Sequence, residues 1–470
     1  MNKRLFSEED QLLFAELSGD SNPLHVDALQ ARRTLFGRQV IHGIHLLLWS
    51  LQSLLTKQCR LNKLNVTFRV PVGVGEPVSC RLVRDDHELK EIVIESRGVE
   101  CASIQVAIDN GLWPLPFQDV TPPQSTSKTV DSSELHKCKG NLDLFYKSDL
   151  GCRLLGDDAP VLPPAQIALL LATTRLVGME CPGTQSIYSQ IALSFHSPQG
   201  QGSNTMNWRV EKADLRFGRI SIKIAVDGCD GTLVAFVRPT SHQQLSFKEV
   251  SVRVRGDLFR DQIALIIGGS RGIGEVCAKV LAAGGATAFI TYRTGAADAE
   301  AVVSDIRAGG AKASTFCFDV LQSEGLPDVF SGRFPTHVYY FATPPIFVAA
   351  KQKYSSDLFL NFYDIYVRGL MSLYDKLRAL HLDDIHFYYP SSVAVAEIQN
   401  GMGEYAAAKA AGETLCRYLA TIDRKIQVHI SRLPRIPTDQ TASLLNVPVA
   451  DAVEILLKML TQENPAESPN

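Results

Sequence analysis

An acid and an imidazole occur close together near the start of the chain, in the segment FAELSGDSNPLHVD at residues 14–27. Asp20 and His25 lie there on irregular, Gly-, Asn- and Pro-rich sequence, which needs a rigid scaffold behind it. Shortly afterwards, His42 and Gly43 open the apolar run IHLLLWSLQSLL, which predicts a buried helix. The first N–H groups of such a helix are free to polarise a carbonyl oxygen. Acid, base and amide donors together suit proton transfer next to a carbonyl, as in adding or removing water across an acyl thioester.

The pattern S-G-D-x-N-P-x-H-x-D, followed by F-G-x-x-V-x-H-G, resembles the MaoC-type hotdog hydratases and dehydratases, the (R)-specific enoyl hydratase group. The resemblance is close over residues 8–48. It implies that Asp20 and His25 form the catalytic pair, that Asn22-Pro23 shapes their segment, and that the Gly43 N–H receives the thioester carbonyl. Without the resemblance, an aspartate-rich turn and a surface histidine would account for the same residues.

Composition and charge narrow the class of protein. An apolar content of 45% with 21% charged residues is ordinary for a globular chain, and 470 residues suggest about three domains. A net charge of −3 offers no basic field for nucleic acid or an anionic membrane. The ten cysteines are scattered singly, which indicates reduced thiols and neither disulfides nor a metal site. With no signal-peptide core and no apolar run of roughly 20 residues, we expect a cytoplasmic protein without membrane insertion.

The first half of the chain reads as a helix followed by strands, twice over. A helix at residues 44–55 and another at 163–178, which starts with proline, are each followed by four strand-like runs. A sheet wrapped around one helix fits this order. The second copy lacks the motif, and its His196 is interpreted as structural, so we expect it to complete the substrate tunnel of a double hotdog. The predicted boundaries are 1–120 for the motif-bearing hotdog, 121–140 for a Pro/Ser/Thr-rich linker and 141–250 for the motif-less hotdog.

From residue 257 the pattern changes to alternating strands and helices. The run IALIIGG at residues 263–269 predicts a buried parallel strand, which leads into the turn GGSRGIG and a helix. Five further strand-like runs follow, with crossover helices between them. Residues 257–470 therefore predict a Rossmann-type, doubly wound parallel α/β sheet. The predicted fold class of the chain is an α+β double hotdog followed by this α/β domain.

The glycine spacing at residues 268–274 resembles the short-chain dehydrogenase/reductase family, whose turn wraps backbone N–H groups around a pyrophosphate. Ser392 lies thirteen positions before Tyr405, which begins the motif Y-x-x-x-K that ends at Lys409. The resemblance covers about residues 262–439. It implies cofactor contacts at Gly268, Ser270, Arg271, Gly272, Ile273, Gly274, Arg293, Asp319, Val320, Ala342, Tyr405, Lys409 and Thr438.

The triad suggests a ketone reductase. Tyr405 and Lys409 are four residues apart on a predicted helix and share one face. An ammonium beside a phenol favours the phenolate and lowers its pKa. Tyr405 would donate a proton to a ketone, or accept one in reverse, while Ser392 holds the carbonyl oxygen. Arg271 and Arg293 could pair with a 2′-phosphate, so NADP(H) is favoured over NAD(H); two solvated arginines are the alternative.

Three positions depart from the reductase pattern. Phe341–Pro344 stands where the family has N-N-A-G, Tyr366 where it has a relay asparagine, and Arg435 where it has a glycine. From the segment after Thr438, we expect neither a long substrate lid nor a last strand. These departures bear on turnover and oligomerisation, and not on the fold.

Two sites for adjacent steps suggest one bifunctional enzyme of fatty-acyl or polyketide-like processing. With NADPH, the reductase would convert a 3-oxoacyl thioester to the 3-hydroxyacyl form, and the hotdog site would dehydrate it to the trans-2-enoyl thioester. The (R) stereochemistry is implied by the hydratase resemblance alone. The carrier, CoA or acyl carrier protein, stays open, as does self-association. Two alternatives remain: a hydratase with a 3-hydroxyacyl-CoA dehydrogenase in fatty-acid breakdown, and an active hotdog beside a non-catalytic nucleotide-binding reductase domain.

Overall fold

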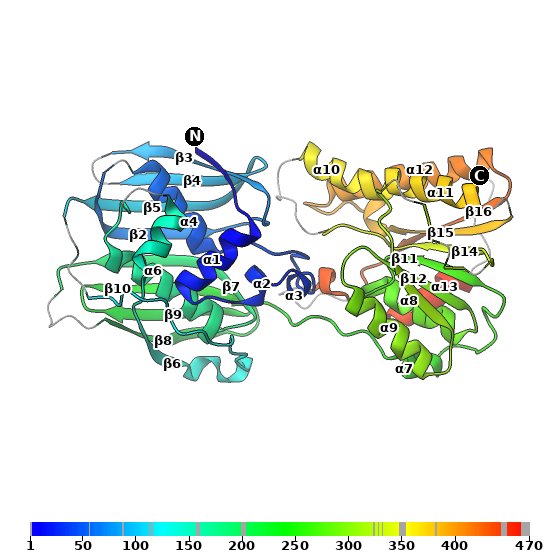
Figure 1. Cartoon of the computed structure of the whole chain (residues 1–470), viewed down its shortest axis with the longest axis horizontal. Helices are drawn as coiled ribbons and strands as arrows, with labels where there is room; N and C mark the ends of the chain where they lie inside the picture. The colour runs from blue at the N-terminus through cyan, green and yellow to red at the C-terminus, as the bar shows by residue number, and fades with distance from the viewer. Residues whose placement is uncertain are drawn as a thin grey trace. The chain divides into compact units, whose positions relative to one another are not determined.

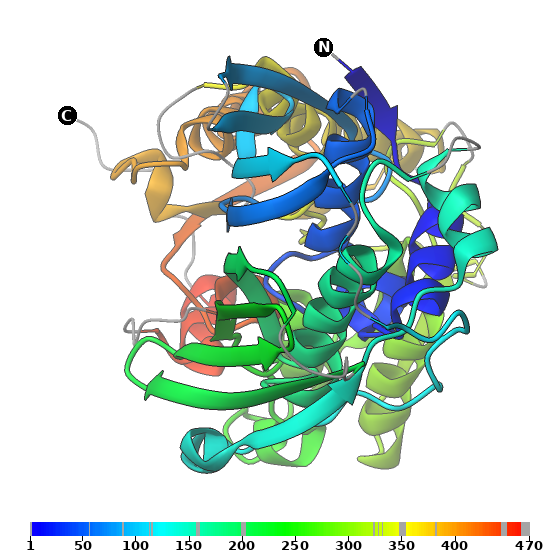
Figure 2. The ribbon, with the colours of Figure 1, turned by 90° about the vertical axis from the view of Figure 1, so that its left-hand side faces the viewer.

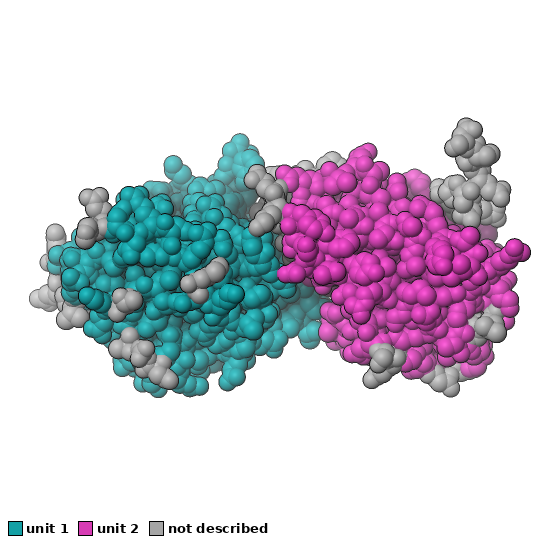
Figure 3. Space-filling view, turned by 90° about the horizontal axis from the view of Figure 1, so that it is seen from above, with its two compact units in different colours: residues 1–240, 443–446 teal, residues 241–442, 447–470 magenta. Residues whose placement is uncertain are grey.

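The chain divides into two compact units, residues 1–240 with 443–446 (unit 1) and residues 241–442 with 447–470 (unit 2; Figure 3). Residues 241–250, predicted as the end of the second hotdog, belong to unit 2. The boundary predicted inside unit 1, at residues 121–140, stays a prediction. The computed structural model describes residues 2–55, 57–86, 89–111, 113, 116–156, 160–198, 204–322, 325–327, 329–330, 332–346, 354–380, 383–442 and 449–461.

Unit 1 contains one ten-stranded antiparallel sheet in the order β1-β3-β4-β5-β2-β7-β10-β9-β8-β6 (Figure 1). The first and second halves of the unit join where β2 pairs with β7, from Lys63 opposite Ser194 to Thr67 opposite Gln190. The strands are β1 Asn2–Leu5, β2 Arg60–Phe68, β3 Pro77–Asp85, β4 Lys90–Ser96, β5 Val99–Asp109, β6 Lys139–Asp143, β7 Ser186–Phe195, β8 Thr205–Asp214, β9 Arg219–Val226 and β10 Cys229–Val237.

Two buried helices lie side by side against this sheet, α4 (Gly43–Leu54) and α6 (Pro164–Arg175), and Figure 2 shows the sheet curving around them. Both are apolar on nearly every side, as expected of helices enclosed by other elements. In each half, the helix precedes the four strands β2–β5 or β7–β10, which is the repeat predicted from the sequence. The remaining helices of unit 1 are α1 Glu8–Ser18, α2 Pro23–Val26, α3 Ala28–Ala31, η1 Ser132–Lys137, α5 Ser148–Leu155 and the π-helix η2 Leu176–Glu180.

Two predicted bounds in unit 1 were wrong. The strand predicted at residues 64–72 is observed at Arg60–Phe68, because Pro71 has no N–H to continue the ladder. The helix predicted to reach residue 178 is α-helical only to Arg175 and then widens into the π-helix η2. This π-helix lies beside the candidate site described below, where such irregular turns are frequent.

Unit 2 contains a six-stranded parallel sheet in the order β13-β12-β11-β14-β15-β16, which confirms the predicted doubly wound sheet. Because all six strands are parallel, their carboxyl ends lie at one edge of the sheet, and such folds bind ligands at that edge where the strand order reverses, here at β11. The strands are β11 Ile263–Ile267, β12 Thr287–Tyr292, β13 Ala313–Cys317, β14 His337–Tyr340, β15 Ile385–Ser392 and β16 Ile426–Leu433. The helices are α7 Phe247–Ser251, α8 Gly272–Ala283, α9 Ala296–Ala308, α10 Ser356–Tyr363, η3 Asp364–Gly369, α11 Leu370–Leu380, η4 Val393–Val395, α12 Gly403–Ile422, η5 Asp439–Thr441 and α13 Ala452–Thr461.

Within the described residues, β13 and β16 are the two edge strands of this sheet. No helix in the described part of either unit is both long and apolar enough to cross a membrane.

Candidate active sites

The segment carrying Asp20 and His25 is shaped by a helix stop and a helix start. Helix α1 ends at Gly19, which adopts a left-handed φ of 73° and would place a Cβ 2.7 Å from Pro122. Helix α2 then begins with Asn22 as its N-cap and Pro23 in its first turn. His25 therefore sits on a short helix whose start is fixed by the sequence N-P, while Asp20 lies in the turn before it.

The Asp20 carboxylate is held from both halves of unit 1. Oδ2 accepts a hydrogen bond of 2.6 Å from the Thr174 hydroxyl of α6. Oδ1 accepts one of 3.2 Å from the backbone N–H of Asn22. A Cβ at Gly178, in η2, would lie 2.2 Å from Oδ1, so only glycine fits beside the carboxylate. The side chain is 1% exposed, and this burial raises the pKa of Asp20, while His25 and the two hydrogen bonds oppose the rise.

His25 points one ring nitrogen to the backbone and keeps the other free. Nδ1 lies 2.8 Å from the carbonyl oxygen of Val40. Because a carbonyl oxygen only accepts, Nδ1 carries the proton and Nε2 keeps its lone pair. Burial lowers the pKa of His25, Asp20 raises it, and Arg238 of the second half lowers it further. The ring is therefore arranged as a neutral base.

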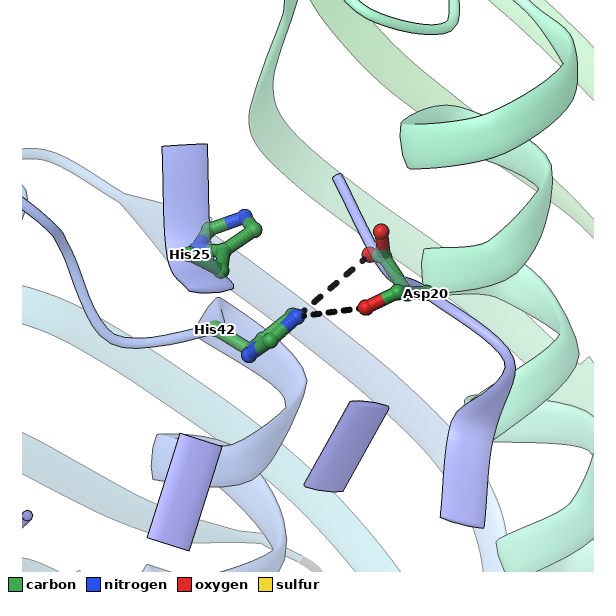
Figure 4. A group of neighbouring side chains, drawn as sticks. All are labelled: Asp20, His25 and His42. Carbon is green, nitrogen blue, oxygen red and sulfur yellow. Dashed lines mark hydrogen bonds and ion pairs between the residues drawn. The ribbon is translucent and has the colours of Figure 1, made fainter. Parts of the chain in front are cut away.

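His42 completes the cluster, and the sequence reasoning did not assign it a role. Its ring stacks on that of His25 with 3.8 Å between centroids, and its Nε2 lies 3.0 Å from the Asp20 carbonyl oxygen and 4.0 Å from Oδ2 (Figure 4). Its Nδ1 faces Gln11 Oε1 at 3.0 Å. Burial, with His25 beside it, holds the pKa of His42 well below its usual range. The signal that could have found it is its place directly before Gly43, at the N-cap of α4.

Gly43 occupies the first position of α4, next to His42. Its N–H belongs to the first turn and has no acceptor within the helix. A Cβ at this position would lie 2.9 Å from the Phe68 ring, so packing admits only glycine. The structure thus brings Asp20, His25 and Gly43 together around His42, as a cluster with an acid, a base and an amide donor.

The second half of unit 1 contacts the segment that carries Asp20 and His25. The Asn22 side-chain amide donates to the carbonyl oxygens of Gly178 at 3.0 Å, Gly183 at 3.2 Å and Thr184 at 3.3 Å. A small apolar cluster of the first half, which includes Leu24, packs against Ile187 of β7. Because this half lacks the motif that carries Asp20 and His25, the sequence offered no reason to single out Thr174 and Gly178.

In unit 2, the predicted glycine turn links β11 to α8. Gly268 and Gly272 adopt left-handed φ angles of 79° and 59°. A Cβ at Gly268 would lie 3.0 Å from the Ala342 amide nitrogen, and one at Gly274 would lie 2.3 Å from the Gly268 carbonyl oxygen. Side chains would fill this turn, so its glycines leave a backbone cradle at the start of a helix that fits a pyrophosphate. Ser270 and Ile273 lie within the same turn.

The other predicted cofactor contacts follow the remaining strands, at the same edge of the sheet. Arg293 follows β12 and is exposed, Asp319–Val320 follows β13, Ala342 follows β14 and Thr438 follows β16. Arg271 differs from the expectation of a free cation, because its guanidinium lies 3.8 Å from the Asp439 carboxylate. Of the two predicted arginines, Arg293 is therefore the more accessible.

Ser392 and Tyr405 are hydrogen-bonded to each other, whereas the Lys409 ammonium bonds to other groups. Burial raises the pKa of Tyr405, and a hydrogen bond with Ser392 opposes the rise. The Lys409 ammonium donates to the Pro390 carbonyl oxygen at 2.8 Å and lies 4.0 Å from the centre of the Tyr366 ring. Burial lowers the pKa of Lys409 to about 7. Without cofactor, burial therefore dominates the pKa of both groups, and the expectation that Lys409 together with the nicotinamide charge lowers the pKa of Tyr405 stays a prediction.

Tyr366 lies where the family pattern places a relay asparagine. It is fully buried in the π-helix η3, and its hydroxyl lies 2.5 Å from that of Thr343, in the altered segment 341–344. Two departures from the family pattern thus contact each other beside Lys409. Arg435, the third departure, donates to the Thr441 carbonyl oxygen and so stays with the loop that carries Thr438.

Comparison with known proteins assigns a family to part of each unit. Residues 2–102 match the family model "MaoC like domain", and residues 262–333 match the model "short chain dehydrogenase". The chain is 38% identical over 88 residues to the (R)-specific enoyl-CoA hydratase of Aeromonas caviae, covering 17% of this chain and 63% of that protein. It is 30% identical over 104 residues to the 3-hydroxybutyryl-CoA dehydratase of Methylorubrum extorquens, covering 21% and 63%.

A third similarity lies with an uncharacterized oxidoreductase of Methylorubrum extorquens. The identity is 28% over 194 residues, covering 38% of this chain and 75% of that protein. The chain spans less than two thirds of the hydratase and dehydratase relatives.

Proposed function

Because the chain joins a MaoC-like dehydratase domain to a short-chain dehydrogenase domain, we propose that it is a bifunctional acyl-thioester enzyme. Unit 2 reduces a 3-oxoacyl thioester to the 3-hydroxyacyl form with NADPH, and unit 1 dehydrates the (R)-3-hydroxyacyl thioester to the trans-2-enoyl form. The observation that carries the proposal is the cluster of Asp20, His25 and Gly43, in which burial moves acid and base towards their neutral forms. The hydratase and dehydratase relatives act on CoA thioesters by name, so acyl-CoA is the first substrate class to test.

For dehydration, the roles of acid and base follow from these directions. Asp20, with its raised pKa, keeps a proton and gives it to the leaving hydroxyl, which departs as water. His25 Nε2 takes the proton from C2, and the electron pair of the broken C2–H bond forms the C2–C3 double bond. The Gly43 N–H stabilises the negative charge that develops on the thioester oxygen. Hydration follows the same steps in reverse.

For reduction, Tyr405 donates its phenolic proton to the ketone oxygen and Ser392 positions that oxygen. The glycine turn at residues 268–274 fits the pyrophosphate of a dinucleotide, and Arg293 is accessible for a 2′-phosphate, which favours NADP(H). When bound, this cofactor supplies the hydride.

The second half of unit 1 is proposed to complete a double hotdog. It repeats the order of one helix and four strands and supplies Thr174, Gly178 and the acceptors of Asn22. On this interpretation it lost its own acid and base and kept the task of holding those of the first half.

A second candidate keeps the dehydratase and assigns unit 2 a nucleotide-binding role without catalysis. The contact of Lys409 with Pro390, rather than with Tyr405, favours it. The two candidates predict different fates for a 3-oxoacyl thioester in the presence of NADPH.

The test follows NADPH oxidation with a short 3-oxoacyl-CoA and identifies the products by mass. Wild type should give the enoyl thioester, Tyr405→Phe should leave the ketone and Asp20→Asn should stop at the 3-hydroxyacyl form, each with its step slowed about 10²- to 10⁴-fold. Asp27→Asn and Tyr418→Phe are matched controls, since Asp27 caps the neighbouring helix α3 and Tyr418 is an exposed residue of α12. If wild type hydrates crotonyl-CoA yet never oxidises NADPH, the reductase proposal fails and the second candidate stands.

A further inference from the structure

Arg238 is a buried cation in the second half of unit 1, one residue beyond β10. Its side chain is 8% exposed, and one terminal nitrogen of its guanidinium donates to the Thr184 carbonyl oxygen. Its Nε–H is buried and has no acceptor among the described residues, and none of the described carboxylates forms an ion pair with it. A charge without a counter-charge is costly in such a place. Its presence therefore calls for a functional reason.

The position of Arg238 links it to the catalytic segment. The Thr184 carbonyl oxygen that receives its guanidinium also receives the side-chain amide of Asn22, at 3.3 Å. Asn22 in turn accepts a hydrogen bond of 3.1 Å from the Leu24 amide and so caps the short helix that carries His25. A continuous set of hydrogen bonds thus connects the second half of unit 1 to the helix that carries His25, through Arg238, Thr184 and Asn22.

Three charged or titratable groups face His25. Asp20 attracts a proton to the ring, and His42 stacks on its face without a charge of its own when neutral. Arg238 repels a proton from the ring. Only Arg238 carries a fixed charge, because arginine stays protonated throughout the working range of the enzyme.

We propose that Arg238 is a positioning residue for the dehydration step: its guanidinium anchors the carbonyl that holds Asn22, and it thereby sets the position and the electrostatic surroundings of His25. The inference rests on the proposed function only in naming the reaction that His25 serves. It assigns the second half an electrostatic role as well as a structural one, since the charge that tunes the base comes from outside the motif.

The test measures His25 directly in the full chain. With histidine labelled by ¹³C at Cε1, the His25 resonance is identified by its loss in His25→Gln, and its pH titration is followed in wild type, Arg238→Gln, Arg238→Met and Arg238→Lys. Either neutral variant should raise the pKa of His25 by about half a unit to one unit, whereas Arg238→Lys should leave it near the wild-type value. The acid limb of the pH profile of kcat/KM for dehydration of 3-hydroxybutyryl-CoA, in which His25 starts as the neutral base, should move by the same amount.

Each outcome decides. An unchanged His25 titration in a folded neutral variant overturns the inference. So does a raised KM with an unmoved titration, which would assign Arg238 to an anionic group of the substrate. A moved titration in a protein that neither hydrates crotonyl-CoA nor forms it would support the inference while the proposed function fails. Having two neutral variants of different shape keeps the test open if one of them does not fold.

Discussion

Asp20 and Tyr405 are the proposed proton donors of the two units, and both are nearly withdrawn from water, at 1% and 8% exposure. Burial disfavours charge in both places, with different consequences. In unit 1 it raises the pKa of Asp20 and lowers that of His25, so that acid and base move towards the neutral forms from which dehydration starts. In unit 2 it raises the pKa of Tyr405 and lowers that of Lys409 to about 7, which weakens the ammonium expected to stabilise a phenolate.

The difference comes from the partners of each group. Asp20 receives hydrogen bonds from Thr174 and Asn22, which hold the side chain and partly offset the rise of its pKa on burial. Lys409 instead faces the Pro390 carbonyl oxygen and the Tyr366 ring, with no carboxylate bonded to its ammonium in the described structure. The proposed acid of unit 1 therefore has its hydrogen-bond partners within the folded chain, whereas Lys409 of unit 2 keeps a costly buried charge that a bound cofactor would have to compensate.

The largest effect is expected from Lys409→Met. Reduction should fall about 10²- to 10⁴-fold, while hydration of crotonyl-CoA is unchanged. Without cofactor, the same change should stabilise the protein by about 1–3 kcal/mol, because it removes a buried charge. The sign of the pH dependence follows from a folded-state pKa of about 7 against a usual value of 10.5. Between these values the unfolded chain holds a proton that the folded chain has released, so wild-type stability rises with pH and the advantage of Lys409→Met shrinks.

Calorimetry of full-length wild type and Lys409→Met at pH 6.5 and pH 9 measures the difference in their stability. Lys279→Met is the matched control, since Lys279 is also buried in unit 2 but pairs with Glu275 at 2.8 Å and Asp305 at 3.0 Å. That change should destabilise, because it leaves two carboxylates without their cation. A Lys409→Met variant that is less stable than wild type at pH 6.5 would show that the comparison between the sites is wrong.

The sequence predicted features that depend on local signals, and it did not predict features that depend on how the chain folds. The order of helices and strands in both units was readable, because apolar periodicity and the glycine turn are local signals, although the bounds at Pro71 and Arg175 were misplaced. The sequence also named Asp20 and Tyr405 through spacing in known motifs. It could not find Thr174, which lies 154 residues from Asp20, because the packing of the two halves against each other, and not spacing along the chain, brings these residues together. It also could not foresee how strongly burial lowers the pKa of Lys409, since burial is a property of the folded chain.

A middle-sized effect is expected from Thr174→Val. It removes the hydroxyl that donates to Asp20 Oδ2 while keeping the shape of the side chain. Loss of one hydrogen bond to the acid should cost about 1.5–3 kcal/mol of transition-state stabilisation, or roughly 10- to 100-fold in kcat for dehydration, with reduction unchanged. Thr174→Ser should stay close to wild type.

Thr173→Val serves as the control, because Thr173 is equally buried on the same helix and its hydroxyl donates to the Leu170 carbonyl oxygen. Equal losses in Thr173→Val and Thr174→Val would indicate a general disturbance of α6 and not a role in holding the acid.

The smallest effect is expected from Tyr366→Phe. The ring that faces the Lys409 ammonium is kept, and only the hydroxyl that meets Thr343 at 2.5 Å is lost. Stability should fall by about 0.5–1.5 kcal/mol, the usual contribution of one such bond, and the reduction rate should change less than about threefold. Urea unfolding and NADPH oxidation measure the two quantities, and Thr343→Val should match the loss of stability because it breaks the same bond. Tyr366→Phe could instead slow reduction as strongly as Lys409→Met. In that case the hydroxyls of Tyr366 and Thr343 form the proton relay for which the family pattern uses an asparagine. The two units would then differ less than their electrostatics suggest, since each would depend on a buried hydroxyl beside its proton donor, Thr174 in unit 1 and Tyr366 in unit 2.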